Sequence, residues 1–126
     1  MLFRSADLGV EGVVVSNHGG RQLDRASTTL ELLPEVVAAV GSRLEVLMDG
    51  GVRNGADVVA ALALGAKGVL VGRAYLYGLM AGGEAGVQRM VDIFSSDIQR
   101  ALQLLGVNSI AELSQDVNPD LVVLRP

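Results

Sequence analysis

The sequence predicts an α/β fold in which parallel strands alternate with helices. Three short runs rich in Val and Leu, at Gly12–Val15, Glu45–Met48 and Gly68–Val71, do not alternate with polar residues. Strands covered on both faces of a parallel sheet have this composition. Segments with helical spacing of apolar residues separate the runs. The order strand, helix, strand, helix, strand is typical of βα units on a parallel sheet.

Apolar residues at intervals of three and four predict the two helices between these runs. The first is expected over residues 30–40, with Gly41 as its carboxyl-terminal cap. The second is expected over residues 56–64, where Gly65 stops it.

After the third run the pattern is helical throughout. A short helix over residues 74–80 is expected to end at Gly82–Gly83, and a long amphipathic helix over about residues 84–105 at Gly106. The stretch Ser109–Glu112 fits a capping box that opens a last short helix. The apolar stripe of the long helix is interpreted as a packing face and not as a cofactor-binding surface. It consists of Val87, Val91, Phe94, Ile98, Ala101, Leu102 and Leu105.

Composition and charge exclude several classes of function. The chain has 126 residues, which suits one domain, and no cysteine, so that disulfides and thiolate metal sites are excluded. Its formal net charge is −4, its basic residues are scattered, and its aromatic residues are two Phe and two Tyr without Trp. These features argue against nucleic-acid binding. No metal site is predicted.

No segment has the features of a signal peptide or a membrane span. The start of the chain is short and polar, with no apolar core before Asp7. The most apolar window, residues 58–71, is interrupted by Gly65, Lys67 and Gly68 and is shorter than a membrane helix. We therefore expect a cytoplasmic protein.

Each predicted strand ends in a specialised loop, and in parallel α/β folds ligands lie at the carboxyl ends of the strands. The first loop, SNHGGRQLD, carries His18, the only histidine of the chain. Its imidazole can accept a proton, and the planar guanidinium of Arg21 matches a carboxylate. Gly19 and Gly20 leave room for a small substrate. This loop indicates proton abstraction from a small carboxylic acid.

The second and third loops, DGGVRNG and GR, are typical of anion binding. Gly50 and Gly51 let the backbone approach a ligand closely, and the loop leads into a helix near Ala56 whose free N–H groups attract an anion. Arg53 and Arg73 can each hold a phosphate through two hydrogen bonds. A short helix after the last strand is a recurring phosphate site in (β/α)8 barrels.

Each of these residues also has an ordinary structural interpretation. A lone histidine can be hydrogen-bonded in a turn, Asp49 can cap a helix, a glycine pair can form a tight turn, and arginines are usually solvated. We favour the functional interpretation because these residues end three consecutive predicted strands, and should therefore lie on one side of the sheet.

Three stretches resemble the carboxyl-terminal part of the FMN-dependent 2-hydroxy acid dehydrogenases and oxidases. They are SNHGGRQLD, LMDGGVRNGADVVAALALGAKGVLVGR and YLYGLMAGGEAGV, and the resemblance extends from about residue 6 to residue 113. It implies an α/β fold that is the carboxyl-terminal part of a (β/α)8 TIM barrel, namely the last three βα units plus terminal helices.

The resemblance implies roles for individual residues. His18 matches the active-site base, Arg21 the arginine that binds the substrate carboxylate, and Ser16 a serine near the flavin. Two further groups match the FMN-binding elements. The ribityl-phosphate loop corresponds to Asp49, Gly50, Gly51, Val52 and Arg53, and the second phosphate element to Gly72 and Arg73.

The chain is expected to be one partial domain. A complete barrel needs eight units and about 250 residues. The family's flavin-contacting lysine, its active-site tyrosine and the aspartate that partners the histidine have no match here, and MLFRS does not resemble the family's preceding helix. We expect a barrel fragment over residues 6–83, terminal helices over 84–114 and a tail over 115–126.

The implied function is FMN-dependent oxidation of an L-2-hydroxy acid. The first candidate reaction is the oxidation of L-lactate to pyruvate, and glycolate and mandelate are the alternative substrates. The base can take the α-proton or the hydroxyl proton, and quinone, cytochrome or oxygen can accept the electrons. The intact parent is expected to be a homo-oligomer with possible contact at the inner membrane surface, and the isolated chain to be inactive. A non-catalytic half-barrel that binds phosphate or self-assembles is the alternative of a different class.

Overall fold

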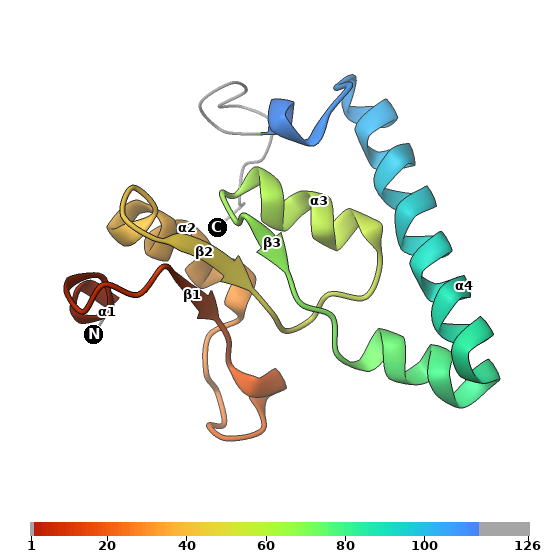
Figure 1. Ribbon diagram of the computed structural model, residues 1–126, viewed down its shortest axis with the longest axis horizontal. Coiled ribbons are helices and arrows are strands. Elements are labelled where there is room, and N and C mark those ends of the chain that lie inside the picture. The colour runs from red at the N-terminus through yellow and green to blue at the C-terminus, as the bar shows by residue number, and fades with distance from the viewer. Residues whose placement is uncertain (1, 114–126) are drawn as a thin grey trace.

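A three-stranded parallel sheet forms the centre of the structure, a computed structural model that describes residues 2–113. Its strands are β1 (Gly12–Val15), β2 (Glu45–Met48) and β3 (Gly68–Val69), in the order β1-β2-β3 (Figure 1). Val14 pairs with Leu47, and Leu47 pairs with Gly68. The predicted parallel α/β arrangement is therefore confirmed, although β3 is two residues shorter than predicted.

The strands alternate with helices, as the sequence predicts. The helices are α1 (Leu2–Asp7), α2 (Thr29–Val40), α3 (Gly55–Ala63) and α4 (Arg73–Leu105), with 3-10 segments η1 (His18–Gly20) and η2 (Ile110–Leu113). The last predicted helix is thus a 3-10 turn, in which the Ser109 hydroxyl lies 3.1 Å from the Glu112 carboxylate. No helix in the described part of the chain is long and apolar enough to cross a membrane.

The first helix, α1, was not expected from the polar start of the chain. It contacts α2, and an ion pair of 2.7 Å joins the Asp7 carboxylate at its end to Arg43, beyond α2. The sequence predicts no element at this position. The helix α1 has too few apolar residues to show the periodicity that predicted the other helices.

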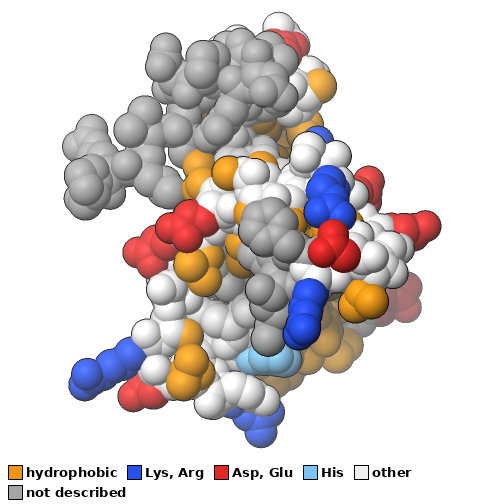
Figure 2. All heavy atoms as spheres, turned by 90° about the vertical axis from the view of Figure 1, so that its left-hand side faces the viewer, with side chains coloured by type: hydrophobic (Ala, Val, Ile, Leu, Met, Phe, Trp, Pro, Cys, Tyr) orange, Lys and Arg blue, Asp and Glu red, His pale blue; other side chains and the backbone are white. Residues whose placement is uncertain are grey.

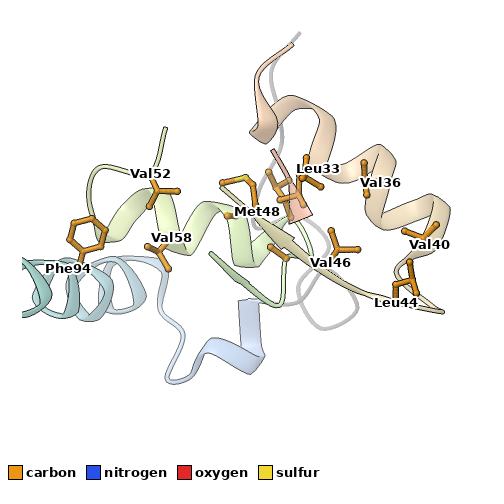
Figure 3. Close-up of a cluster of buried hydrophobic side chains, with 13 residues drawn as sticks. Leu33, Val36, Val40, Leu44, Val46, Met48, Val52, Val58 and Phe94 are labelled. Atoms are coloured by element: carbon orange, nitrogen blue, oxygen red, sulfur yellow. The ribbon is translucent and has the colours of Figure 1, made fainter. Parts of the chain in front are cut away.

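The core lies on one face of the sheet, between the strands and the two helices α2 and α3. Val46 and Met48 of β2 are 1% and 2% exposed and share one cluster with Leu33 of α2 and Val58 of α3 (Figure 3). Because side chains alternate along a strand, both helices cover the same face of β2.

The opposite face of the sheet is bare in the described part of the structure. Val14 of β1 and Leu70, which follows β3, are each 47% exposed. The apolar composition predicts strands that can be covered on both faces, whereas the described residues cover only one. The runs are apolar on both sides, yet burial within β2 follows the alternating pattern of a strand with one covered face.

A kink divides α4 into the two helices that the sequence predicts. Gly82 and Gly83 have non-helical backbone angles, and Gly83 adopts a positive φ of 58° (Figure 1). A side chain at Gly86 would overlap the Gly78 carbonyl, so the two parts pack with their backbones in close contact. The long part ends at Gly106, with a φ of 72°.

The long part of α4 packs against α3. Phe94 is buried, and a Cβ at Gly55 would lie 2.5 Å from the Phe94 carbonyl oxygen, so the two helices touch through their backbones. The predicted packing stripe is only partly covered, because Val91 and Leu105 are 45% and 39% exposed. The nine residues of α3 are too few to cover the whole length of α4.

Candidate functional site

The loops that follow the three strands enclose one cavity of about 630 Å³. This size is typical of small-molecule sites. The walls come from segments far apart in the sequence, which the parallel sheet brings to the same edge. The lining residues are His18, Gly19, Asp49, Gly50, Gly51, Val52, Arg53, Leu70, Val71, Gly72, Arg73, Ala74 and Tyr77.

The loop after β1 forms a turn that presents His18. Three consecutive residues, His18, Gly19 and Gly20, have positive φ values of 53°, 67° and 78°. A residue other than glycine in this region costs about 1–3 kcal/mol and persists only where its surroundings hold it in place. Two hydrogen bonds do so: the His18 N–H donates to Ser16 Oγ at 3.2 Å, and the Gly19 N–H donates to Asn17 Oδ1 at 3.0 Å. The imidazole is exposed on the surface shown in Figure 2.

The loop after β2 places a buried carboxylate oxygen beside the cavity. Asp49 Oδ1 is shielded from solvent and has no hydrogen-bond partner among the described residues. Gly50 and Gly51 have φ values of 88° and 80°, which favour glycine. An oxygen of this kind is normally satisfied, so a hydroxyl of a bound molecule is a suitable donor.

A capping box forms at the start of α3, where the sequence predicts N–H groups that attract an anion. The Asp57 carboxylate accepts the Arg53 N–H at 2.8 Å and the Asn54 N–H at 3.2 Å, and the Asn54 side chain accepts the Asp57 N–H. This capping box satisfies donors at the helix start and adds a negative charge. Anion binding by the remaining N–H groups of the helix start, by the glycines and by the Arg53 side chain stays a prediction.

The start of α4 is the open helix end in the cavity. Its cap residue, Gly72, makes no side-chain capping hydrogen bond, and Gly72, Arg73 and Ala74 all line the cavity. Helix N–H groups that lack a cap attract an anion, and the Arg73 guanidinium adds a full positive charge. Arg53 and Arg73 therefore approach the same space from different loops.

Four cavity residues were not predicted, namely Leu70, Val71, Ala74 and Tyr77, and of these Tyr77 has a polar side chain. It lies one helical turn after Arg73 on α4 and is 60% exposed. The spacing of four residues places both side chains on one helix face. That spacing, applied to the helix after GR, was the signal that could have found it.

Two predicted site residues lie outside the cavity lining. Ser16 acts on the turn itself, through its hydrogen bond to the His18 N–H. Arg21 is exposed at the end of η1, where its N–H lies 3.4 Å from the His18 carbonyl oxygen. The structure thus groups His18 with the proposed FMN-binding residues and leaves Arg21 beside them. Among residues 2–113 no cluster of His, Cys, Asp or Glu could hold a metal ion.

A family model described as FMN-dependent dehydrogenase matches residues 3–119. The chain is 57% identical over 108 residues to a putative L-lactate dehydrogenase of Mycobacterium tuberculosis, which covers 86% of this chain and 26% of that protein. It is 53% identical over 113 residues to an L-lactate dehydrogenase of Caulobacter vibrioides, covering 90% and 30%. The 2-hydroxyacid oxidase 2 of Rattus norvegicus is 53% identical over 108 residues, covering 86% and 31%.

The fold is also similar to solved structures. A mandelate oxidase with benzoyl-formic acid superposes with a TM-score of 0.85 at 46% sequence identity, covering 89% of this chain and 33% of that chain. A variant of mandelate oxidase with a monooxide FMN adduct gives the same TM-score and covers 36% of that chain. The present chain therefore spans about a third of the length of the proteins that it matches.

Proposed function

This chain belongs to the FMN-dependent dehydrogenase family, and from that premise we propose that it is the carboxyl-terminal part of a (β/α)8 barrel that oxidises an L-2-hydroxy acid. Its relatives include proteins named L-lactate dehydrogenase and 2-hydroxyacid oxidase. Three neighbouring parallel strands in chain order support a barrel segment of three βα units. In this proposal, residues 6–83 are barrel and 84–114 terminal helices; the tail, 115–126, lies outside the described residues.

The observation that carries the proposal is the shared cavity, where an imidazole and two guanidinium groups meet from three loops. The arginines and the open start of α4 suit a phosphate. The imidazole of His18 suits proton transfer. A site that only bound phosphate would have no need of a histidine held at positive φ.

The residues present fit FMN, the cofactor of the family. Arg53, Arg73 and the N–H groups after Gly72 would hold its phosphate, and the unpaired Asp49 oxygen would accept a hydrogen bond from a ribityl hydroxyl. Gly50 and Gly51 leave the backbone free of side chains on this path. When bound, FMN supplies the acceptor for two electrons.

The chain's own residues would handle the substrate's proton and charge. Oxidation of a 2-hydroxy acid to a 2-oxo acid removes two electrons and two protons. An imidazole nitrogen of His18 would accept one proton, from either the α-carbon or the hydroxyl. Arg21 would pair with the substrate carboxylate, reaching it from its exposed position at the end of the His18 turn.

L-lactate is the first candidate substrate because relatives named L-lactate dehydrogenase are 50–57% identical. The similarity to mandelate oxidase makes mandelate one alternative, and glycolate stays the other alternative that the sequence resemblance implies. The bare sheet face favours a second possibility, a half-barrel that assembles with itself and binds phosphate without catalysis.

A chimera separates these functions. The matched segment of the Caulobacter L-lactate dehydrogenase is replaced by residues 3–119 of this chain, and the purified protein is mixed anaerobically with L-lactate, glycolate or L-mandelate. Bleaching of bound flavin, fastest with L-lactate, is the expected result. A chimera that retains flavin but is reduced by none of the three acids would contradict the proposal.

A further inference from the structure

Two side chains outside the cavity lining, Asn17 and Thr29, connect the loop that carries His18 to the Asp49–Arg53 loop. Asn17 is half-buried, and Thr29, at the start of α2, is 3% exposed. We propose that both are positioning residues that couple the two loops, so that an anion held in the Asp49–Arg53 loop changes the environment of the His18 imidazole. This inference rests on the proposed function, because it takes the cavity as an anion site.

Asn17 uses both ends of its amide to hold the His18 turn. Its Oδ1 accepts the Gly19 N–H at 3.0 Å, and its Nδ2 donates to the Ser27 carbonyl at 3.2 Å. Its backbone carbonyl accepts the Gly20 N–H at 2.9 Å. The turn therefore cannot relax from its positive φ values without breaking contacts to the segment before α2. Aspartate or leucine, although similar in shape, cannot donate to Ser27.

Thr29 holds the second loop through its hydroxyl group. Its hydroxyl donates to the Gly50 carbonyl at 3.3 Å, and Thr29 is the one buried polar residue in the described part of the chain. A buried hydroxyl and carbonyl left without each other would each lack a hydrogen-bond partner, which is unfavourable in the interior. The hydrogen bond therefore fixes the Gly50 peptide against the start of α2.

The two positioning residues meet at Gly50. A Cβ at this position would lie 3.3 Å from both Asn17 Oδ1 and Thr29 Oγ1. Both side chains thus lie on the side of Gly50 to which a Cβ would point, and Gly50 also lines the cavity. A shift of the Gly50–Gly51 backbone on anion binding would therefore change its contact with Asn17 and its hydrogen bond to Thr29, and Asn17 holds the turn of His18.

The sole histidine provides a direct test in the full 126-residue chain. The protein is labelled with ¹³C-histidine, so that its imidazole gives a single set of NMR signals, and inorganic phosphate is added. Binding of phosphate is followed independently by ³¹P NMR. In the wild type, phosphate should displace the His18 signals; Asn17→Ala and Thr29→Val should still bind phosphate but lose most of this displacement. Thr29→Ser, which keeps the hydroxyl, should retain it.

Two further variants keep the test decisive. Ser95→Ala removes a hydroxyl bonded to the Val91 carbonyl on α4 and should behave as wild type. Asn17→Ser keeps an acceptor for the Gly19 N–H but not the donor to Ser27, and should lose the displacement of the His18 signals. This variant provides the test if Asn17→Ala does not fold.

The failure of the coupling can be told from the failure of the proposed site. Equal displacement in the wild type, Asn17→Ser and Thr29→Val, at equal phosphate occupancy, would overturn the coupling. Wild-type binding of phosphate with an unmoved imidazole would also overturn it and leave the anion site intact. A wild type that binds no phosphate would overturn the anion site and the coupling with it.

Discussion

At the scale of single residues, the two cavity arginines differ in their surroundings. Arg53 lies beside the Asp57 carboxylate, which accepts its backbone N–H, whereas Arg73 stands on a helix start that has no side-chain cap. The positive end of the α4 dipole and the guanidinium act together at Arg73. We therefore expect Arg73 to be the more important of the two for holding a phosphate.

Replacing this arginine should weaken cofactor binding in the chimera. Arg73→Ala removes a charge-assisted contact, which is worth about 1.5–3 kcal/mol. The Kd for FMN, measured by quenching of flavin fluorescence, should rise accordingly. Arg89→Ala, on the same helix but outside the cavity lining, is the matched control and should leave the Kd unchanged. Equal affinities of Arg73→Ala and wild type would remove Arg73 from the phosphate site.

Replacing the histidine should separate catalysis from cofactor binding. His18→Ala in the chimera should keep its flavin but lose turnover by about a hundredfold to ten-thousandfold, the usual contribution of acid–base catalysis. Stopped-flow reduction of the flavin by L-lactate measures this step without the electron acceptor. A His18→Ala chimera that reduces its flavin at the wild-type rate would rule out His18 as the base.

At the scale of secondary-structure elements, the bend in α4 places its first turns at the cavity and its long part against α3. The contact between the two parts depends on Gly78 and Gly86, whose backbones touch. Gly82, at the bend, has open space around the position of a Cβ and an extended φ of −161°. The glycines of α4 should therefore differ in their tolerance of a methyl group.

Gly86→Ala should destabilise the chain, whereas Gly82→Ala should be nearly neutral. The methyl group at residue 86 overlaps the Gly78 carbonyl, and forced overpacking of this kind costs about 1–3 kcal/mol. The higher helix propensity of alanine, about 1 kcal/mol, offsets part of this cost. The free energies of unfolding are compared by urea titration. Equal stabilities of the two variants would show that the close crossing is not required.

Periodicity predicted most of these elements, and local polar contacts explain most of the differences. The apolar runs gave β1 and β2 at their observed bounds. The capping box of Asn54 and Asp57 was missed although its residues have the spacing of such a box, because apolar periodicity placed the start of the helix at Ala56. The strand β3 ends at Val69 because its partner strand β2 ends at Met48, which pairs with Val69.

The site was predictable to the extent that it follows from parallel topology. Parallel strands end at the same edge of the sheet, and this brings His18, Asp49 and Arg73 together regardless of the loop conformations. The sequence could not show that Arg21 lies beside the cavity, because its position depends on the left-handed turn at His18. Tyr77 was missed because its approach depends on the direction in which α4 leaves Gly72.

At the scale of the whole molecule, the bare sheet face should drive self-association of the isolated chain. Val14 and Leu70 are exposed on this face, and in the described part of the structure β1 and β3 each leave one strand edge unpaired. Exposed apolar patches and open edges both promote association. Sedimentation velocity should show species larger than a monomer. The double substitution Val14→Glu and Leu70→Glu should reduce them, whereas Leu104→Glu, on α4 and 82% exposed, should not.

The isolated chain should not oxidise L-lactate, even with excess FMN. Three strands cannot close a barrel, so the cavity lacks the opposite wall that would cover a flavin ring and exclude water. The phosphate end would still find Arg53 and Arg73, which predicts weak binding without turnover. His18 has no carboxylate hydrogen-bonded to its side chain in the described structure, and Arg21 faces solvent. The test is anaerobic mixing of the 126-residue chain with FMN and L-lactate, with the chimera as the positive control. Flavin bleaching by the chain at the rate of the chimera would mean that the three βα units are sufficient, and that the interpretation as an incomplete barrel is wrong.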